Sequence, residues 1–363
     1  MARSGSNATG KSSAGSFFED FSLGQVLRHA PPRSVGSGEQ ALYIALTGSR
    51  FALHCSDSFA RSLGYERAPL DDLLTFHLVF GQSVPDISLN AVANLGYAAC
   101  RFGAPLYSGD ELSAESRVIG LKQNSDGKSG VVYVETKGVN QRGELLVEFC
   151  RWVMVRKRDA NAPAPKTTIP ELAERVAPAD FMLPEGLDFA RFDPATAGAR
   201  HRWDDYAPGE RIDHRDGMTL EEAEHQSATR LYQNTARVHF DLAAAKGGRF
   251  GKRLVYGGHV ISLARALSFN GLGSALRIAA INGGRHVAPV FAGDTLYAWS
   301  EVLEKLEVPG RRDLAALRLR TLAVKDRPAA GFPGRSVEGS YDPAVVLDLD
   351  YSVLLPRRAS ATR

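Results

Sequence analysis

The hydrophobic residues of this chain gather in short β-branched and aromatic runs that are separated by clusters of turn-forming residues. In the first half, the turn clusters Asn124–Gly127 and Asn140–Gly143 flank such a run at Val131–Val134, and a second run follows at Leu145–Phe149. Runs of this composition, bounded by turns rich in Asn and Gly, favour strands joined in hairpins. The pattern therefore predicts a meander of antiparallel strands.

Two longer apolar runs have the length of a helix. Asp71–Phe80 opens on two acidic residues, which favour a helix N-terminus, and Gly258–Leu267 is the matching run in the second half. Because both runs precede their strands, we expect each half to begin with its helix and to continue as a sheet. An apolar helix buries its face by lying across such a sheet, which predicts the α+β class with a curved antiparallel sheet wrapped on one central helix.

The chain also repeats itself with an offset of about 185 positions. Three anchors keep this register: residues 18–29 return as 203–214, His54 returns as His239, and residues 104–112 return as 288–296. A duplication explains the register, and each copy has the usual size of one domain. Two copies in one chain can pair their sheets edge to edge, which hides backbone groups that a free sheet edge exposes.

The segments around the two copies set the expected domain boundaries. Residues 1–15 are low in complexity and predict a disordered tail. A Pro/Ala-rich stretch at 159–200 predicts a linker that contains one short helix near Glu171–Glu174. The N-terminal repeat then occupies residues 16–158, and the C-terminal repeat occupies residues 201–358.

Composition and charge restrict the class of protein. Hydrophobic residues make up 44% of the chain and charged residues 23%, which provides for a full core and excludes disorder over most of its length. A net charge of +3 without a basic stripe argues against a nucleic-acid surface. No apolar stretch reaches the length of a membrane span, and three cysteines without a paired spacing favour a reducing compartment. We therefore expect a cytoplasmic protein.

Residues 5–12 satisfy the phosphate-loop pattern GxxxxGK[ST]. That motif works only between a buried strand and a helix, because its backbone amides must be held around the phosphates. Four residues precede Gly5, and Ser/Gly-rich sequence follows the pattern. We therefore assign this match to the flexible tail and expect no nucleotide there.

The segment around the two repeated histidines resembles the MaoC-like hydratase/dehydratase family. Thr47–His54 resembles the family pattern Gly-Asp-x-Asn-Pro-Leu-His, and Gln233–His239 occupies the equivalent place in the second half. The resemblance spans about residues 17–157 and 203–355 and implies a tandem (double) hot-dog fold. It also implies addition or removal of water across the double bond of an acyl-CoA thioester, in an expected homodimer. Such chemistry implies no cofactor beyond the coenzyme A of the substrate, and no metal-ligand spacing is present in the sequence.

Both halves depart from the family pattern at its aspartate, which is Ser49 in the first half and Asn234 in the second. Longer strings resemble the branch of the family that acts on mesaconyl thioesters, in which we expect the Asn-Thr-Ala form of this segment. These strings are Val84–Tyr97, Arg151–Lys157 and Tyr232–Asp241. The resemblance to this branch implies reversible hydration of mesaconyl-C1-CoA to β-methylmalyl-CoA.

We expect the second half to hold the working site, with His239 as its acid/base group. An imidazole can take up or release a proton near neutral pH, and Asn234 or Asp241 would orient it. The amides of Gly257 and Gly258, at the start of the second helix, would bind the thioester oxygen. At the equivalent positions the first half has Asp72 and Leu73. This acidic and bulky pair would repel an enolate and prevent its close approach to the backbone.

A free carboxylate on the substrate requires a cationic partner. Arg237, next to the His239 segment, is the first candidate because a guanidinium can bind a carboxylate with two hydrogen bonds. Arg230 and Arg285 are the alternatives.

Two other functions stay open at this stage. An (R)-specific enoyl-CoA hydratase or fatty-acyl dehydratase would share the fold and the thioester, but it would need an apolar tunnel and no carboxylate clamp. A non-catalytic acyl-CoA-binding module would explain why the aspartate is lost from both halves. His54, in the first half, is interpreted as a structural histidine rather than a catalytic one.

Overall fold

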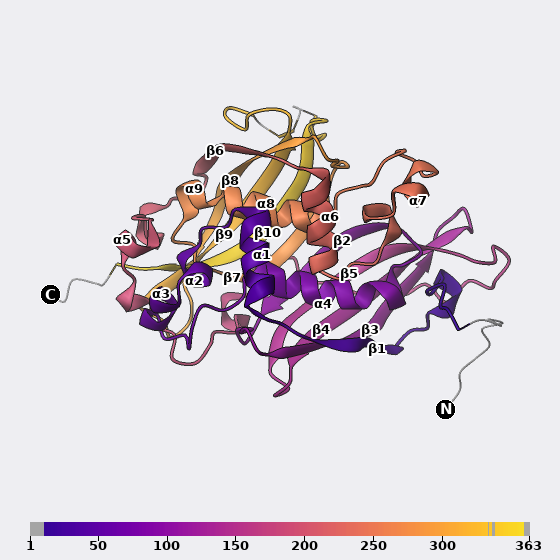
Figure 1. Cartoon of the computed structure of the whole chain (residues 1–363), viewed down its shortest axis with the longest axis horizontal. Helices are drawn as coiled ribbons and strands as arrows, with labels where there is room; N and C mark the ends of the chain where they lie inside the picture. The colour runs from indigo at the N-terminus through magenta and orange to yellow at the C-terminus, as the bar shows by residue number, and fades with distance from the viewer. Residues whose placement is uncertain (1–10, 333, 336–337, 359–363) are drawn as a thin grey trace.

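The computed structural model describes residues 11–332, 334–335 and 338–358, so most of the phosphate-loop match and of the expected tail lie outside the described residues. One ten-stranded antiparallel sheet forms the centre of the molecule (Figure 1). Its strands follow the order β1-β3-β4-β5-β2-β7-β10-β9-β8-β6. Their bounds are β1 (Val26–Ser34), β2 (Ala91–Phe102), β3 (Glu111–Gln123), β4 (Ser129–Asn140), β5 (Leu145–Arg156), β6 (Arg211–Thr219), β7 (Arg277–His286), β8 (Thr295–Leu306), β9 (Leu314–Lys325) and β10 (Val345–Pro356).

The two halves contribute five strands each, in the same internal order, and they meet where β2 pairs with β7. Tyr97 lies opposite Gly284 and Cys100 lies opposite Ile281 in this pair. The expected edge-to-edge pairing of the two sheets is thus confirmed. The expected meander is also confirmed, because β3, β4 and β5 pair in sequence through the turns at Asn124–Gly127 and Asn140–Gly143.

Two central helices, α4 (Asp72–Ile87) and α8 (Gly257–Leu267), lie on one face of the sheet (Figure 1). They meet where His77 Nε2 lies 2.9 Å from Ser262 Oγ, and these two residues occupy the same position of the repeat. Both expected helices are confirmed, but α4 extends beyond the expected end at Phe80 and continues through Pro85 to Ile87. A large apolar core contains residues of both halves, so neither half packs independently of the other.

In each half a strand precedes the central helix, which corrects the expected order of helix first and sheet after. β1 and β6 form the two edges of the sheet and expose much of their length, so they lack a clear apolar pattern. A buried histidine attaches each strand to its neighbour: His29 Nε2 lies 2.8 Å from Ser116 Oγ, and His214 Nε2 lies 2.8 Å from Ser300 Oγ.

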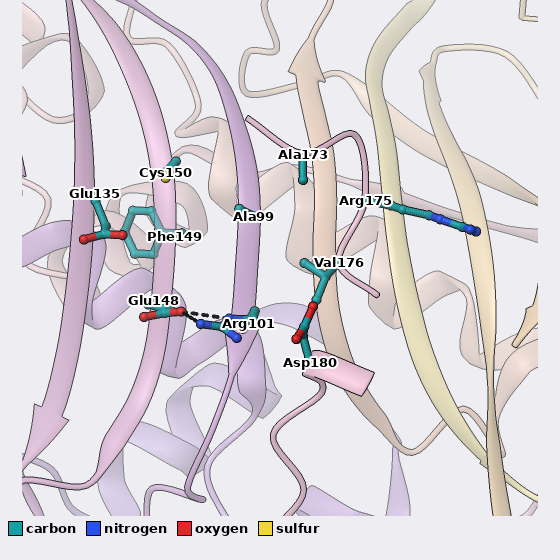
Figure 2. Close-up of a pocket in the computed structure, with 10 residues that line it drawn as sticks. All are labelled: Ala99, Arg101, Glu135, Glu148, Phe149, Cys150, Ala173, Arg175, Val176 and Asp180. Atoms are coloured by element: carbon teal, nitrogen blue, oxygen red, sulfur yellow. Dashed lines mark hydrogen bonds and ion pairs between the residues drawn. The ribbon is translucent and has the colours of Figure 1, made fainter. Parts of the chain in front are cut away.

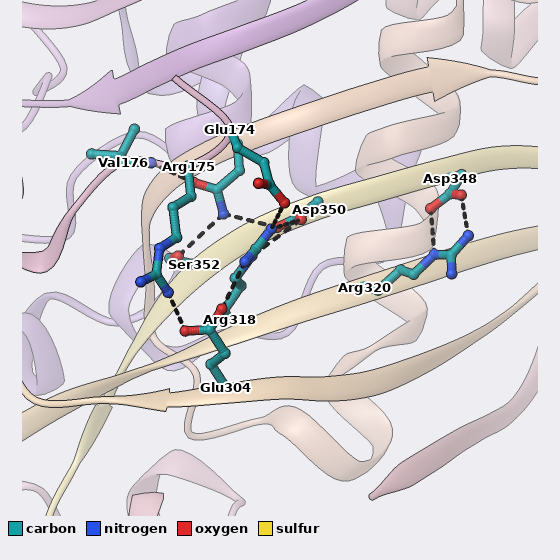
Figure 3. Close-up of polar contacts among 10 residues, drawn as sticks. Glu174, Arg175, Val176, Glu304, Arg318, Arg320, Asp348, Asp350 and Ser352 are labelled. Carbon is teal, nitrogen blue, oxygen red and sulfur yellow. Dashed lines mark hydrogen bonds and ion pairs between the residues drawn. The ribbon is translucent and has the colours of Figure 1, made fainter. Parts of the chain in front are cut away.

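The linker crosses the face of the sheet opposite to the central helices (Figure 3). The expected helix near Glu171–Glu174 is wrong, because this stretch has no regular secondary structure and bends at 174–175, where contacts to the strands hold it. The amide of Val176 donates to Asn282 Oδ1 at 3.0 Å, and Arg175 pairs with Glu304. Three short helices follow: η2 (Pro178–Asp180), η3 (Phe189–Arg191) and α5 (Pro194–Ala197).

The remaining helices are short, and several of them pack over α4 and α8 (Figure 1). Two of them carry the repeated histidines: α2 carries His54 and η5 carries His239. No helix of the described residues is long and apolar enough to cross a membrane. The bounds are η1 (Phe18–Asp20), α1 (Ser37–Thr47), α2 (Ala52–Cys55), α3 (Asp57–Ser62), η4 (Trp203–Asp205), α6 (Glu222–Leu231), η5 (Arg237–His239), α7 (Leu242–Lys246) and α9 (Phe269–Leu272).

Candidate active site

His239 ends the short helix η5 in the second half. Its Nδ1 lies 2.8 Å from the carbonyl oxygen of Leu254, an acceptor that fixes the proton on Nδ1 and leaves Nε2 as an acceptor. Burial lowers the pKa of His239 to about 4, so the ring is neutral at pH 7. The turn leaves Nε2 of this partly buried ring without a hydrogen-bond partner among the described residues.

The two residues expected to orient His239 have other partners. Asn234 Oδ1 accepts a hydrogen bond from the amide of Ala236 at 3.0 Å, which closes the turn that leads into η5. Asp241 caps α7 by accepting from the amide of Ala244 at 2.9 Å. The backbone carbonyl of Leu254, rather than either side chain, holds the imidazole.

The residue before Asn234 supports a functional role for this turn. Gln233 has a φ of 53°, a left-handed conformation that is uncommon for residues other than glycine. Its counterpart in the first half is Gly48, which adopts the same region without strain. Strained backbone of this kind concentrates at functional sites, and of the two equivalent turns the strained one lies in the half that also has the open helix end described next.

The N-terminus of α8 begins at Gly257 and has no side-chain cap. The first amides of a helix have no acceptor within the helix, and they carry its partial positive charge. In the first half the corresponding end is filled, because Asp71 accepts from the amide of Leu73 at 2.9 Å and Asp72 accepts from the amide of Ile278 at 2.9 Å. Of the two central helices, α8 is therefore the one that offers free amides to an oxyanion.

Both glycines at this helix end are required by close neighbours. A Cβ atom on Gly257 would lie 2.5 Å from Cε1 of His286, and one on Gly258 would lie 2.6 Å from the hydroxyl oxygen of Tyr256. A side chain at either position would force the neighbouring ring to move. His286 and Tyr256 therefore pack directly on the start of α8.

The first half also contributes to this site, although the sequence pattern placed every candidate in the second half. Tyr97 reaches across from β2, and its hydroxyl lies 3.2 Å from His286 Nε2. Burial lowers the pKa of His286 to about 4 as well. Strand alternation could have indicated His286: because Arg285 is exposed, its neighbour in β7 points to the helix side.

The three arginines expected to bind a carboxylate are exposed. Arg230 lies in the last turn of α6, and Arg237 begins η5, the segment that carries His239. Arg285 lies opposite Asp348 in the sheet register and therefore shares the face of the sheet on which Asp348 pairs with Arg320. The structure therefore does not bring Arg285 to the other expected site residues.

Two surface pockets lie elsewhere and do not include these residues. The pocket in Figure 2 lies on the outer face, between β2, β5 and the linker, and its arginines Arg101 and Arg175 pair with Glu148 and Glu304. The other pocket lies beside α9 and the end of the linker. A histidine with a free Nε2 beside an uncapped helix end offers groups suited to thioester chemistry, which a surface hollow with paired charges does not. Among the described residues, no cluster of His, Cys, Asp and Glu could hold a metal ion.

Known proteins resemble this chain over nearly its whole length. The profile of the mesaconyl-CoA hydratase family matches residues 6–337. The chain is 63% identical to the beta-methylmalyl-CoA dehydratase of Chloroflexus aurantiacus over 348 residues, which are 96% of this chain and 99% of that protein. It is 59% identical to the mesaconyl-CoA hydratase of Cereibacter sphaeroides over 349 residues, which are 96% of this chain and 100% of that protein.

Solved structures agree with these matches. The crystal structure of a putative MaoC domain protein dehydratase from Chloroflexus aurantiacus superposes with a TM-score of 0.94 at 63% identity, over 97% of this chain and 100% of that one. A conserved hypothetical protein from Mycobacterium tuberculosis with a double hot-dog fold superposes with a TM-score of 0.72 at 25% identity, over 95% of this chain and 99% of that one. The expected α+β double hot-dog fold is confirmed, and the chain belongs to the mesaconyl-CoA hydratase family.

Proposed function

We propose that this chain is a hydro-lyase that catalyses the reversible hydration of mesaconyl-CoA to β-methylmalyl-CoA, with the thioester at C1. The names of the two relatives that are 59% and 63% identical support this reaction. The observation that carries the proposal is the neutral His239, with Nε2 free, in the half whose central helix begins with two uncapped glycine amides.

The amides of Gly257 and Gly258 bind the thioester oxygen in this proposal. Water addition to an α,β-unsaturated thioester places negative charge on that oxygen, and preorganised amides stabilise the charge as it develops. The partial positive charge of the α8 N-terminus adds to the effect. In the first half the Asp72 carboxylate occupies the same place, and its negative charge would oppose an enolate.

His239 moves the proton. Nε2 accepts a proton from a water molecule while the oxygen of that water bonds to C3 and the C2–C3 π electrons move onto the thioester oxygen as an enolate. The protonated ring then returns a proton to C2 as the thioester carbonyl re-forms, so the reaction adds one water and consumes no cofactor. The Nδ1–H bond to the Leu254 carbonyl keeps the ring in place throughout.

The other expected residues act indirectly. Asn234 positions the His239 turn through its bond to the Ala236 amide, and Asp241 holds the following helix α7. The exposed Arg230 and Arg237 suit the phosphates of coenzyme A, which are the exposed anions of such a substrate.

Turnover of mesaconyl-C1-CoA and crotonyl-CoA by the purified protein tests the proposal. Loss of the enoyl thioester is followed, and the product is identified by mass. Selective conversion of mesaconyl-C1-CoA to a product one water heavier supports it, whereas preference for crotonyl-CoA supports a general enoyl-CoA hydratase. Binding of both thioesters without turnover would indicate a non-catalytic acyl-CoA-binding module.

The matched pair His239→Ala and His54→Ala tests the location of the site. His54 Nδ1 lies 3.2 Å from the Pro69 carbonyl, so the two histidines have the same local geometry in their respective halves. We expect His239→Ala to lower kcat by about 100-fold or more, because removal of a general base has effects of this size. Loss of activity in His54→Ala alone would move the site to the first half.

A further inference from the structure

Arg151, in β5 of the first half, is a buried cation without an acidic partner. Its side chain has 0% exposure, and no Asp or Glu of the described residues forms an ion pair with it. Its guanidinium donates to Ser83 Oγ at 2.8 Å and lies 4.2 Å from the centre of the Phe80 ring. Burial lowers the pKa of Arg151 to about 10, so it stays charged at pH 7.

Several polar atoms at this point lack partners. Arg151 Nε is buried and has no hydrogen-bond acceptor among the described residues, and the hydroxyl of Tyr256 is also buried without a partner. Tyr97 lies opposite Arg151 in the sheet register, and the hydroxyls of both tyrosines are close enough to influence the guanidinium electrostatically. A buried donor without an acceptor is costly, so such a group usually has a ligand that completes it.

This cluster adjoins the proposed thioester site. The Tyr256 hydroxyl lies over Gly258, because a Cβ atom on that glycine would be 2.6 Å away. The Tyr97 hydroxyl bonds to His286, which lies against Gly257. In mesaconyl-C1-CoA the free carboxylate is attached to C3, two carbons beyond the thioester carbon, so a receptor must lie this close to the helix end.

We propose that Arg151 and the Tyr256 hydroxyl form the receptor for the free carboxylate of a dicarboxylic acyl-CoA. This inference rests on the proposed function for the position of the thioester. It replaces Arg237, Arg230 and Arg285 in this role, because those three side chains are exposed and screened by water.

The receptor makes the site selective for dicarboxylic thioesters, because a substrate without the second carboxylate would leave the buried cation unpaired. A carboxylate that reaches Arg151 leaves water completely, but it gains charge-assisted hydrogen bonds in an environment where they are strong. A monocarboxylic thioester such as crotonyl-CoA would place a methyl group there and leave the cation unpaired. The site therefore favours the dicarboxylic substrate both by attraction and by rejection of its apolar analogue.

Binding of a saturated, unreactive pair of thioesters tests the receptor without requiring turnover. Succinyl-CoA and butyryl-CoA have the same chain length and differ in the terminal carboxylate, and calorimetry on the full chain measures their affinities. We expect succinyl-CoA to bind at least tenfold more tightly, and we expect Arg151→Met to abolish this preference. Arg151→Lys, which keeps the charge but not the planar fork, should retain part of it.

Arg265→Met is the matched control, since Arg265 is also buried and stacks on a phenylalanine, Phe51, at 3.6 Å. Its guanidinium has its own acceptors in Ser268 and the Ala275 carbonyl, so this change should lower the melting temperature and leave the succinyl/butyryl ratio as in the wild type. Arg151→Met should not lower the melting temperature as much, because it removes a buried unpaired charge.

Steady-state kinetics distinguish failure of this inference from failure of the proposed function. With mesaconyl-C1-CoA, Arg151→Met should lose on the order of 100-fold in kcat/KM, whereas its crotonyl-CoA activity should hold or rise. Wild-type protein without turnover but with the succinyl-CoA preference would contradict the proposed reaction and keep the receptor. An unchanged preference in Arg151→Met, or its loss in Arg237→Met instead, overturns the receptor.

Discussion

Asp72 and its counterpart Gly257 are the first residues of the two central helices. The difference between their side chains changes which ligand the helix N-terminus can bind. Asp72 binds the amide of Ile278, and its neighbour Asp71 caps the end of α4. Gly257 leaves the end of α8 open and lets the His286 ring pack against its Cα. In the proposed site, the absence of a side chain at Gly257 and of a capping side chain at Tyr256 leaves the start of α8 accessible to a thioester oxygen.

Gly257→Ala tests the close approach at this position. The added methyl group would lie 2.5 Å from the His286 ring, so the ring must move and the thioester site changes shape. We expect kcat/KM for mesaconyl-C1-CoA to fall by about tenfold to 100-fold, since small displacements of site residues have effects of this size. Steady-state kinetics and a melting curve measure the two effects separately.

Gly38→Ala is the control, because a Cβ atom there meets nothing within 4 Å. It should leave kcat/KM unchanged. In a double-mutant cycle, His286→Ala should cost much less in the Gly257→Ala background than in the wild type, because both changes disturb the same contact. Fully additive effects of the two changes would contradict the proposed clash.

The pH dependence of catalysis follows from the neutral state of His239. Burial lowers the pKa of this ring to about 4, and the protonated ring cannot accept a proton from water. We expect kcat/KM to stay level from pH 7.5 to about 5.5 and to fall toward pH 4, whereas an ordinary histidine would lose half its activity near pH 6.5. Rapid pH-jump assays make this measurement before unfolding begins, and a midpoint near 6.5 would contradict it.

At the scale of elements, α4 and the end of α6 approach so closely that only glycine fits between them. A Cβ atom on Gly81 would lie 1.7 Å from the backbone carbonyl oxygen of Tyr232. Backbone cannot yield as a flexible side chain does, so one element must shift. The Tyr232 carbonyl directly precedes the Gln233–Asn234 turn, so this contact also fixes the segment that leads to His239.

Gly81→Ala should therefore destabilise the protein by about 1–3 kcal/mol and lower activity together with stability. Urea unfolding measures the loss, and kcat/KM at low temperature reports on the turn. Ala266, the counterpart of Gly81 on α8, supplies the matched opposite change: Ala266→Gly should cost about 1 kcal/mol through helix propensity alone. A Gly81→Ala variant as stable as the wild type would show that α4 has room to move.

Much of the element pattern could be predicted from the sequence because each signal was local. Local composition was enough to predict the two central helices and the two hairpin turns. The helices α4 and α8 are apolar runs, and the turns at Asn124–Gly127 and Asn140–Gly143 are rich in turn-forming residues. The edge strands β1 and β6 gave no such signal, since exposed strands need no apolar alternation. The stretch at Glu171–Glu174 has helical composition, but its tertiary contacts to the strands keep it extended.

The site was less predictable because it forms between two distant segments of sequence. His239, Gly257 and Gly258 lie in motif-bearing stretches, and comparison of the two repeats selected them. Tyr97 and Arg151 come from the other half, and only the pairing of β2 with β7 and β5 brings them to α8. The carboxylate candidates chosen near His239 in sequence are exposed arginines, whereas the buried Arg151 lies on a strand of the other half.

At the scale of the whole molecule, a set of buried histidines links stability to pH. Burial lowers the pKa of His214 and His286 to about 4 each and that of His259 to about 3, and it holds the pKa of His77 well below its usual value. These rings are neutral in the folded chain, whereas in the unfolded chain they take up protons as the pH falls below about 6.5. The unfolded state therefore binds more protons, and stability must rise with pH in this range.

We expect the free energy of unfolding to be level above about pH 7.5 and to fall steadily between pH 6.5 and pH 4. At pH 5 the fully buried His214 and His259 should cost about 2 kcal/mol each, a large share of the stability of an ordinary domain. Carboxylates whose pKa is lowered by ion pairs, such as Asp348, lose their contribution mainly below about pH 4.5. Urea titrations at pH 7.5, 6.0 and 5.0 therefore isolate the histidines. His214→Asn should reduce the difference in the free energy of unfolding between pH 7.5 and pH 5.0 by about 2 kcal/mol, because one proton-binding site is removed from the unfolded state. This holds even if the variant is less stable at both pH values. A free energy of unfolding that is constant over this range would mean that water reaches these rings in the folded protein.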